Sequence, residues 1–230
     1  MTMDVATTAR SGGGSDSQTA MRLLISLDVL GTPVPAPSPF PTAVKVVKSL
    51  TRLEKLDFWM RNPDYLADEL LNDLDSGILE FADVQPHVAR MLTGLAPALH
   101  QYPMSRYLYG AYERVDNALS ILKSLGLINH KRVADAGSKA RRDYYLLAAG
   151  AAAVDRMRAE IEPIAWYDQQ ARAILLLASA QYGTTARTRQ YEQPEYKAAA
   201  IGVDIPSILD RVIGRAADLG IDITTTVGHP

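Results

Sequence analysis

The sequence of 230 residues contains no cysteine, and none of its apolar runs approaches the roughly 20 residues of a membrane-spanning helix. The missing thiols exclude disulfide bonds, thiolate catalysis and zinc sites built on cysteine. The first residues also lack the apolar segment of a secretory signal. We therefore expect a cytoplasmic protein with no membrane partner, since a chain without cysteine fits a reducing compartment.

An excess of charge of one sign is missing as well. The 24 Lys and Arg side chains are balanced by 26 Asp and Glu side chains, so the formal net charge is -2. No overall positive field draws such a chain to nucleic acid, and any contact of that kind needs a local cluster of cations. Hydrophobic residues make up 47% of the sequence, which is enough for a sizeable core in one large domain or two small ones.

Composition divides the chain into four regions. Residues 1–20 are polar and rich in Gly and Ser, so we expect a disordered tail. Residues 21–103 are predicted to be helical around a proline-rich, extended connector at 32–41. Residues 104–161 combine a helix with two β-like runs. Residues 162–230 are predicted to form C-terminal helices that serve oligomerisation or the docking of a partner.

Periodic apolar residues predict amphipathic helices over residues 21–31, 42–61 and 112–125. A further helix is expected after Asn62, which suits an N-cap, because Pro63 suits the first helical position. The acidic residues that follow in this helix fit its N-terminal dipole and a solvated surface.

Two β-like runs, LINHKRV and RRDYYLL, follow the helix that Gly126 ends. A loop of small and polar residues with a central glycine separates them, and a helix resumes from Gly150. Helix, glycine, strand, basic loop, strand and helix is the element order of a winged helix. We therefore expect a mainly α fold with one small β-wing, that is, a winged helix-turn-helix with additional N- and C-terminal helices.

This segment also resembles a known family over residues 107–161. LSILKSLGLI is similar to the recognition helix and turn of MarR- and PadR-type regulators, and RRDYYLLAAGAAAVDRM to their second wing strand and the helix after it. Tyr144 or Tyr145, Leu146 and Gly150 match the Tyr, Leu and Gly of that pattern. Leu147 stands where the family usually has a capping Thr. The resemblance implies a winged-helix protein that binds DNA.

A second resemblance covers more of the chain. RLEKLDFW at residues 52–59, MSRYLYGAY at 104–112 and the LGLI turn are arranged as in a group of bacterial winged-helix proteins. That group includes phage-associated proteins and the middle subunits of three-component ATPase defence systems. This resemblance implies a structural adaptor subunit rather than a regulator.

Candidate DNA contacts lie on the expected wing and recognition helix. A cluster of cations within twelve residues can follow phosphates, and it comprises Lys131, Arg132, Lys139, Arg141 and Arg142. The helix side that faces away from its apolar seam can reach base edges, with Arg114, Asn117, Ser120 and Lys123. Glu113 and Asp116 in the same turns repel phosphate. A solvated hairpin and an ordinary exposed helix face are the alternatives.

Candidate interface residues are large and apolar. Four of them follow one another in a helix and cannot all face one core, and the fifth is an aromatic residue of the kind found in interface hot spots. They are Trp59, Ile174, Leu175, Leu176 and Leu177. For Trp59, packing in the core is the alternative.

The sequence carries no nucleophile motif, no phosphate-binding loop and no pair of histidines at metal-ligand spacing, so we expect no enzyme, no cofactor and no metal. Two functions stay open. One is a dimeric transcriptional regulator that binds DNA through its wing. The other is an adaptor subunit that links a coiled-coil ATPase of the SMC or ABC type to an effector in a defence or chromosome-maintenance complex.

Overall fold

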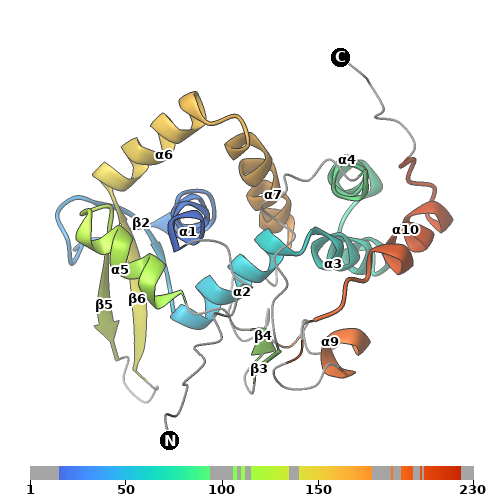
Figure 1. Ribbon diagram of the computed structural model, residues 1–230, viewed down its shortest axis with the longest axis horizontal. Coiled ribbons are helices and arrows are strands. Elements are labelled where there is room, and N and C mark those ends of the chain that lie inside the picture. The colour runs from blue at the N-terminus through green and yellow to red at the C-terminus, as the bar shows by residue number, and fades with distance from the viewer. Residues whose placement is uncertain are drawn as a thin grey trace, which may run out of the picture.

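The computed structural model describes residues 16–93, 106–107, 110–111, 115–134, 140–177, 188, 193–198, 203 and 205–223. The described chain is mainly helical with a small antiparallel sheet (Figure 1). The helices are α1 (Asp16–Leu30), α2 (Leu50–Arg61), α3 (Pro63–Asp75), α4 (Phe81–Leu92), α5 (Asp116–Ser124), α6 (Ala148–Glu160), α7 (Ile164–Leu176), α9 (Pro194–Ala198) and α10 (Leu209–Asp218). No helix among the described residues is long and apolar enough to cross a membrane.

The main sheet has four antiparallel strands in the order β1-β2-β6-β5. The strands are β1 (Thr32–Pro33), β2 (Ala43–Val47), β5 (Ile128–Val133) and β6 (Arg141–Leu147), and a separate pair joins β3 (Arg106–Tyr107) to β4 (Gly110–Ala111). Strand β6 is central, because it pairs with β2 on one side and with β5 on the other. The sheet therefore crosses the boundary that we predicted at residue 104.

The predicted helix over residues 42–61 is wrong in its first part, where the chain forms β2. Its AVKVV sequence is rich in β-branched residues and finds a partner in β6, which decides in favour of a strand. Helix α2 begins only after Ser49. The Ser49 side chain caps this helix by accepting a hydrogen bond from the Arg52 amide at 3.1 Å.

The predicted disordered tail over residues 1–20 is too long. Helix α1 begins at Asp16, and both Thr19 and Ala20 are buried. The apolar side of the helix extends one turn further back than the sequence pattern indicated, because Ala20 packs in the core. Residues 1–15 lie outside the described residues.

The start of α3 confirms one prediction and corrects another. Pro63 occupies the start of the helix, as expected. Asn62 precedes it but makes no side-chain cap, since its Nδ2 donates to the Phe58 carbonyl of the preceding helix at 2.7 Å. Asn62 therefore stabilises the end of α2 rather than the beginning of α3.

The proline-rich connector is folded against the sheet. Thr32 and Pro33 form β1 and pair with β2. Further along, the ring of Phe40 packs edge-on against Tyr145 of β6, with 5.3 Å between the ring centroids. The connector thus covers part of the sheet.

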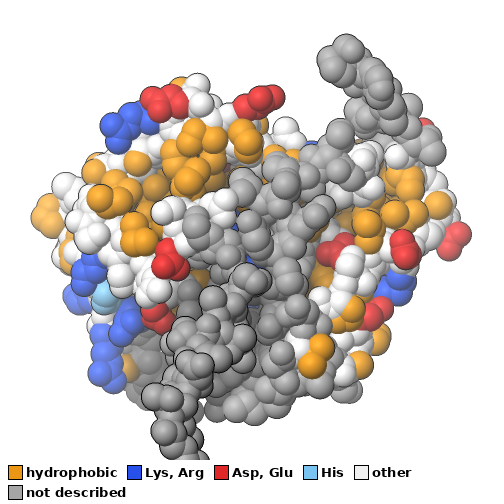
Figure 2. Space-filling view, in the orientation of Figure 1, with side chains coloured by type: hydrophobic (Ala, Val, Ile, Leu, Met, Phe, Trp, Pro, Cys, Tyr) orange, Lys and Arg blue, Asp and Glu red, His pale blue; other side chains and the backbone are white. Residues whose placement is uncertain are grey.

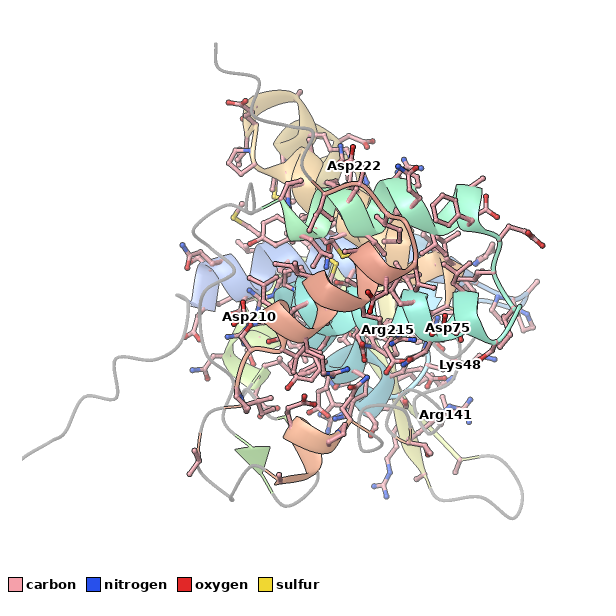
Figure 3. The ribbon with its side chains drawn as sticks, turned by 90° about the vertical axis from the view of Figure 1, so that its right-hand side faces the viewer. Lys48, Asp75, Arg141, Asp210, Arg215 and Asp222 are labelled. Atoms are coloured by element: carbon pink, nitrogen blue, oxygen red, sulfur yellow. The ribbon has the colours of Figure 1, made fainter. Side chains whose placement is uncertain are left out.

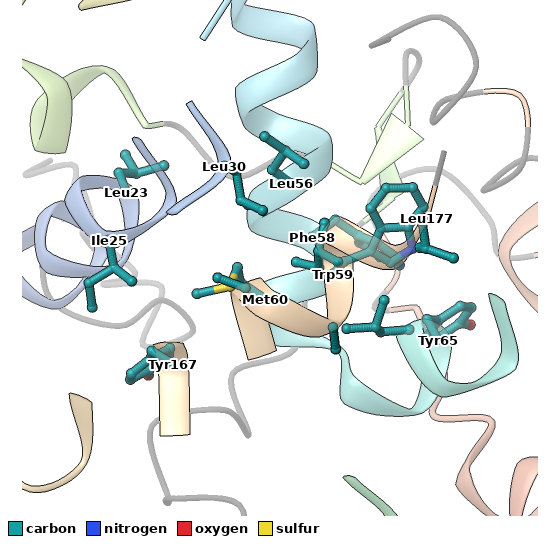
Figure 4. Packing of buried hydrophobic residues seen from close by; sticks show 14 of the residues in the cluster. Leu23, Ile25, Leu30, Leu56, Phe58, Trp59, Met60, Tyr65, Tyr167 and Leu177 are labelled. Carbon is teal, nitrogen blue, oxygen red and sulfur yellow. The ribbon is translucent and has the colours of Figure 1, made fainter. Parts of the chain in front are cut away.

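Helix α1 lies at the centre of the packing, in contact with α2, α5, α6 and α7 (Figure 1). Leu23 and Ile25 of α1 and Trp59 of α2 are 0% exposed, and their neighbours form one continuous cluster (Figure 4). Helix α10 packs against α3 and α4, beyond α2 in Figure 1. The core places α5 and the hairpin β5–β6 at one end of the molecule and α10 at the other.

Candidate nucleic-acid interface

Helix α5 presents a polar side to solvent. Ala118, Leu119 and Leu122 are buried against the core. The candidate residues on the other side, Asn117, Ser120 and Lys123, are all exposed. The predicted helix phase is therefore correct at these positions. Candidate residue Arg114 lies outside the described residues.

Gly126 turns the chain from α5 into β5. Its φ of 67° belongs to the left-handed region, which glycine adopts without steric cost. The turn places the end of α5 beside the hairpin, so the two elements can share one surface.

The register of β5 and β6 divides the hairpin cations between two faces, because successive side chains of a strand point to opposite faces. Lys131 lies opposite Asp143, and Val133 opposite Arg141. The other face carries two further opposed pairs, which are Arg132 with Arg142 and His130 with Tyr144. Lys139 lies outside the described residues.

Arg141 is held by an internal partner. Its Nε donates to Oδ1 of Asp143 at 2.9 Å, and the Asp143 side chain is almost completely buried. The same carboxylate accepts a hydrogen bond from the Ser49 amide at 3.2 Å. This arrangement joins β6 to the start of α2. It gives Arg141 a structural contact that competes with the predicted contact to phosphate.

Arg132 and Arg142 have a different environment. Both are exposed, and neither forms an ion pair with any residue that the structure describes. Like charges directly opposite each other in a sheet are destabilising. The fold therefore keeps these two guanidinium groups together on the surface at some cost in stability.

His130 lies on the same face of the hairpin as Arg132 and Arg142. Its pKa lies below the ordinary value because of partial burial and because of the nearby charges of Lys123 and Arg142. On the same face of the hairpin, Arg142 lies two residues from Tyr144, which is directly opposite His130. We call Lys123, His130, Arg132 and Arg142 the cation cluster. Figure 2 shows cations and a histidine gathered over this end of the molecule, at the lower left.

Carboxylates gather at the opposite end of α5. Asn117 donates through Nδ2 to the Asp16 carboxylate at 3.2 Å. Burial raises the pKa of Glu54 on α2 to about 7. Lys55 opposes this rise, and the charge of Asp116, at the start of α5, adds to it. Helix α5 therefore has an acidic N-terminal end and a cationic C-terminal end.

The interface candidates separate into core and surface residues. Trp59, Ile174 and Leu177 are 0% exposed, so they do not fit the predicted interface role. They are covered by the chain itself, because α7 packs against α1 and α2. Leu176 is partly buried, and Leu175 is 54% exposed. Of the apolar run in α7, Leu175 is the residue that remains open to a partner.

A second polar cluster, which the sequence did not reveal, joins α3 to α10. Asp68 is 2% exposed and accepts hydrogen bonds from Arg211 at 3.1 Å and Arg215 at 2.9 Å. Arg215 also pairs with Asp75 (Figure 3). These groups line an open groove of about 440 Å³. The expectation that the α3 acids are solvated dipole partners is wrong for Asp68.

Asp64 has a similar structural role. Its Oδ2 accepts hydrogen bonds from the Ser207 hydroxyl and the Ile208 amide, both at 2.8 Å, just before α10. The regular spacing of Arg211 and Arg215 was the available signal for this packing, since residues four apart share one helix face. Within the described ranges, no group of three or more Asp, Glu and His residues is arranged to hold a metal ion.

Comparison of the chain with protein-family models, with curated proteins and with solved structures finds no match.

Proposed function

We propose that this chain is a winged-helix protein that binds duplex DNA and has no catalytic activity. The order of its elements supports this fold. Helix α1, strand β2 and helix α2 are followed, after an insertion that contains α3 and α4, by α5 and the hairpin β5–β6. Strand β2 pairs with β6, so three of the four strands of the main sheet have the order β2-β6-β5 that a winged helix would have, with β1 as an additional edge strand. In this proposal α5 is the recognition helix and β5–β6 is the wing.

The observation that carries the proposal is the opposed pair of exposed arginines, Arg132 and Arg142, on one face of the hairpin. Two exposed guanidinium groups that repel each other are relieved when a phosphate lies between or beside them. Phosphate binding also releases counterions from the duplex, which supplies binding free energy. His130 adds positive charge only in acidic solution, because its pKa lies below the ordinary value.

The broader role that we propose is a dimeric transcriptional regulator. A symmetric dimer matches two half-sites on DNA. Its seam would include Leu175, which is 54% exposed on α7. Sedimentation of the purified chain tests this role: the regulator is a dimer that Leu175→Glu converts to a monomer, and a wild-type monomer contradicts it.

The adaptor subunit remains a second candidate. The acidic N-terminal end of α5, with Asp16 and Asp116, favours it because carboxylates there oppose the close approach of a recognition helix to phosphates. In this case Leu175 contacts a coiled-coil ATPase or an effector, and the isolated chain is a monomer.

DNA binding is tested with the double charge reversal R132E/R142E. A short fluorescent duplex of generic sequence is titrated at low salt and followed by fluorescence anisotropy. We expect the affinity to fall by about tenfold or more, because two attractions to phosphate are replaced by two repulsions. The matched control is R156E/R172E, which makes the same change of charge at two exposed positions on α6 and α7.

Equal affinity of wild type and R132E/R142E contradicts the proposal. So does an equal loss of affinity in R156E/R172E, since that result assigns the binding to net charge rather than to the cation cluster. Thermal melts of both variants show whether they are folded. Both changes lie on exposed side chains, so we expect melting within about 4 °C of wild type.

A further inference from the structure

The two ends of α5 differ in charge, and this difference bears on what the proposed DNA-binding surface recognises. A recognition helix usually reads base edges with residues near its N-terminus. Here that end carries Asp116 and lies beside Asp16 and Glu54. The charges of Asp16 and Asp116 at this end would repel the phosphates that line a groove, and Glu54 adds to this repulsion when it is ionised.

Asn117 is the exposed α5 residue best suited to read a base, because an amide side chain can bind adenine with two hydrogen bonds. Its Nδ2 is already engaged by the Asp16 carboxylate at 3.2 Å. Reading a base would require this bond to break and would leave Asp16 close to the DNA. The exposed polar residues further along α5, Ser120, Lys123 and Ser124, offer short hydroxyls and a point charge, which discriminate bases poorly.

The cationic end has the properties of a phosphate surface. Lys123 and the opposed Arg132 and Arg142 are exposed. The charges of Lys123 on α5 and Arg142 on β6 contribute to the lowered pKa of His130. These groups come from three elements, α5, β5 and β6, and His130, Arg132 and Arg142 share one face of the hairpin. Phosphate contacts hold a protein on the duplex but carry no sequence information.

Resting on the proposed DNA binding, we infer that the cation cluster grips the phosphate backbone and that α5 does not read base sequence. The ligand of this surface is therefore duplex DNA of any sequence. This inference keeps the proposed DNA binding but replaces the regulator role, because a regulator that matches two half-sites must read base sequence. The acids at the N-terminal end of α5 set how closely that helix approaches the duplex.

The inference is tested by binding the full-length protein to two duplexes of equal length and unrelated sequence, and to a random-sequence duplex pool carried through rounds of selection. We expect affinities for the two duplexes that agree within about threefold. A sequence reader would instead enrich from the pool a duplex that it binds about a thousandfold or more tightly than the other two. The selected pool should contain no consensus.

Variants make the test specific to the two ends of α5. Asn117→Ala should leave the affinity for both duplexes unchanged within about twofold, since binding rests on phosphate contacts alone. The double variant D16N/D116N should tighten binding to both duplexes equally, because it removes two charges that repel phosphate. R132A/R142A should weaken binding to both equally.

A consensus sequence in the selected pool that disappears in Asn117→Ala overturns the inference and leaves the proposed DNA binding intact. Weaker binding of D16N/D116N to one duplex also overturns it, because that result assigns base contacts to the acids. If the wild-type protein binds no duplex at low salt, the proposed function itself fails, and the inference fails with it.

Discussion

The two ends of the molecule use arginine in opposite ways. At α10, Arg211 and Arg215 each donate to Asp68, and Arg215 reaches Asp75 as well. On the hairpin, Arg132 and Arg142 face each other, with no ion pair among the described residues. Figure 3 shows Arg215 close to Asp75 and Arg141 on the separate hairpin.

This difference separates arginines that hold the fold together from arginines that are available to a ligand. A guanidinium with buried carboxylate partners stabilises the packing of its helix. Two guanidinium groups opposite each other destabilise the hairpin slightly, and an anion that binds between them relieves this repulsion. Arg141 belongs with the first kind although it is on the hairpin, because Asp143 holds it.

The largest effect is expected where α5 meets the core. Leu122 is 3% exposed, so Leu122→Ala should lower the free energy of unfolding by about 2–5 kcal/mol. Arg132→Ala, at an exposed position on β5, should change the free energy of unfolding by no more than about 0.5 kcal/mol. Urea unfolding of both variants measures the contrast. A decrease below about 0.5 kcal/mol for Leu122→Ala shows that its side chain does not pack in the core.

The next largest effect is expected at α10. Asp68→Ala leaves the donors of Arg211 and Arg215 without their shared acceptor, and we expect the free energy of unfolding to fall by about 1–3 kcal/mol, since both arginines are partly exposed. DNA affinity should stay within about twofold of wild type, because the cation cluster is untouched. Asp210→Ala, which removes a carboxylate from an exposed position on α10, is the control.

Urea unfolding and duplex binding, measured on the same samples, separate the two roles. If Asp68→Ala weakens DNA binding as much as R132A/R142A does, then the α10 cluster also contacts the ligand, and the two ends of the molecule do not differ in the way described.

The smallest effect concerns the acidic end of α5. The pKa of Glu54 is raised to about 7, so the folded state binds more protons than the unfolded state between pH 4.5 and pH 7. The contribution of Glu54 to stability therefore falls as pH rises through this window. Glu54→Gln should remove that fall and raise the melting temperature at pH 8 by about 2–4 °C, equivalent to about 1 kcal/mol.

Thermal melts of Glu54→Gln and wild type at pH 5 and pH 8 measure this effect, with the exposed Glu162→Gln as the control. An equal shift at both pH values contradicts this prediction, because it assigns the change to packing rather than to the ionisation of Glu54.

Local patterns in the sequence predict much of the hairpin region. Gly126 ends the helix, and both hairpin strands are visible as short β-like runs. The pairing of Arg141 with Asp143 is also within reach, since residues two apart share a strand face. The pair of Arg141 and Asp143 is overlooked when the hairpin cations are treated as one cluster and are not assigned to the two faces of the sheet.

Contacts between distant parts of the chain are not predictable in the same way. Strand β2 lies in a stretch whose apolar spacing suits a helix, and only its partner β6 makes it a strand. Asp68 and Arg211 are 143 positions apart, and nothing local in either helix indicates the other. The burial of Trp59 and Ile174 likewise depends on how α1, α2 and α7 pack.

We propose that Arg132 and Arg142 contact DNA phosphates and that the paired arginines elsewhere do not. The most direct measurement is the dependence of duplex affinity on salt concentration for wild type, R132A/R142A and the control R156A/R172A. We predict that the slope of log K against log salt becomes shallower by about 1.8 in R132A/R142A, at about 0.9 for each phosphate that is no longer neutralised, and stays unchanged in the control. An unchanged slope in R132A/R142A contradicts this claim.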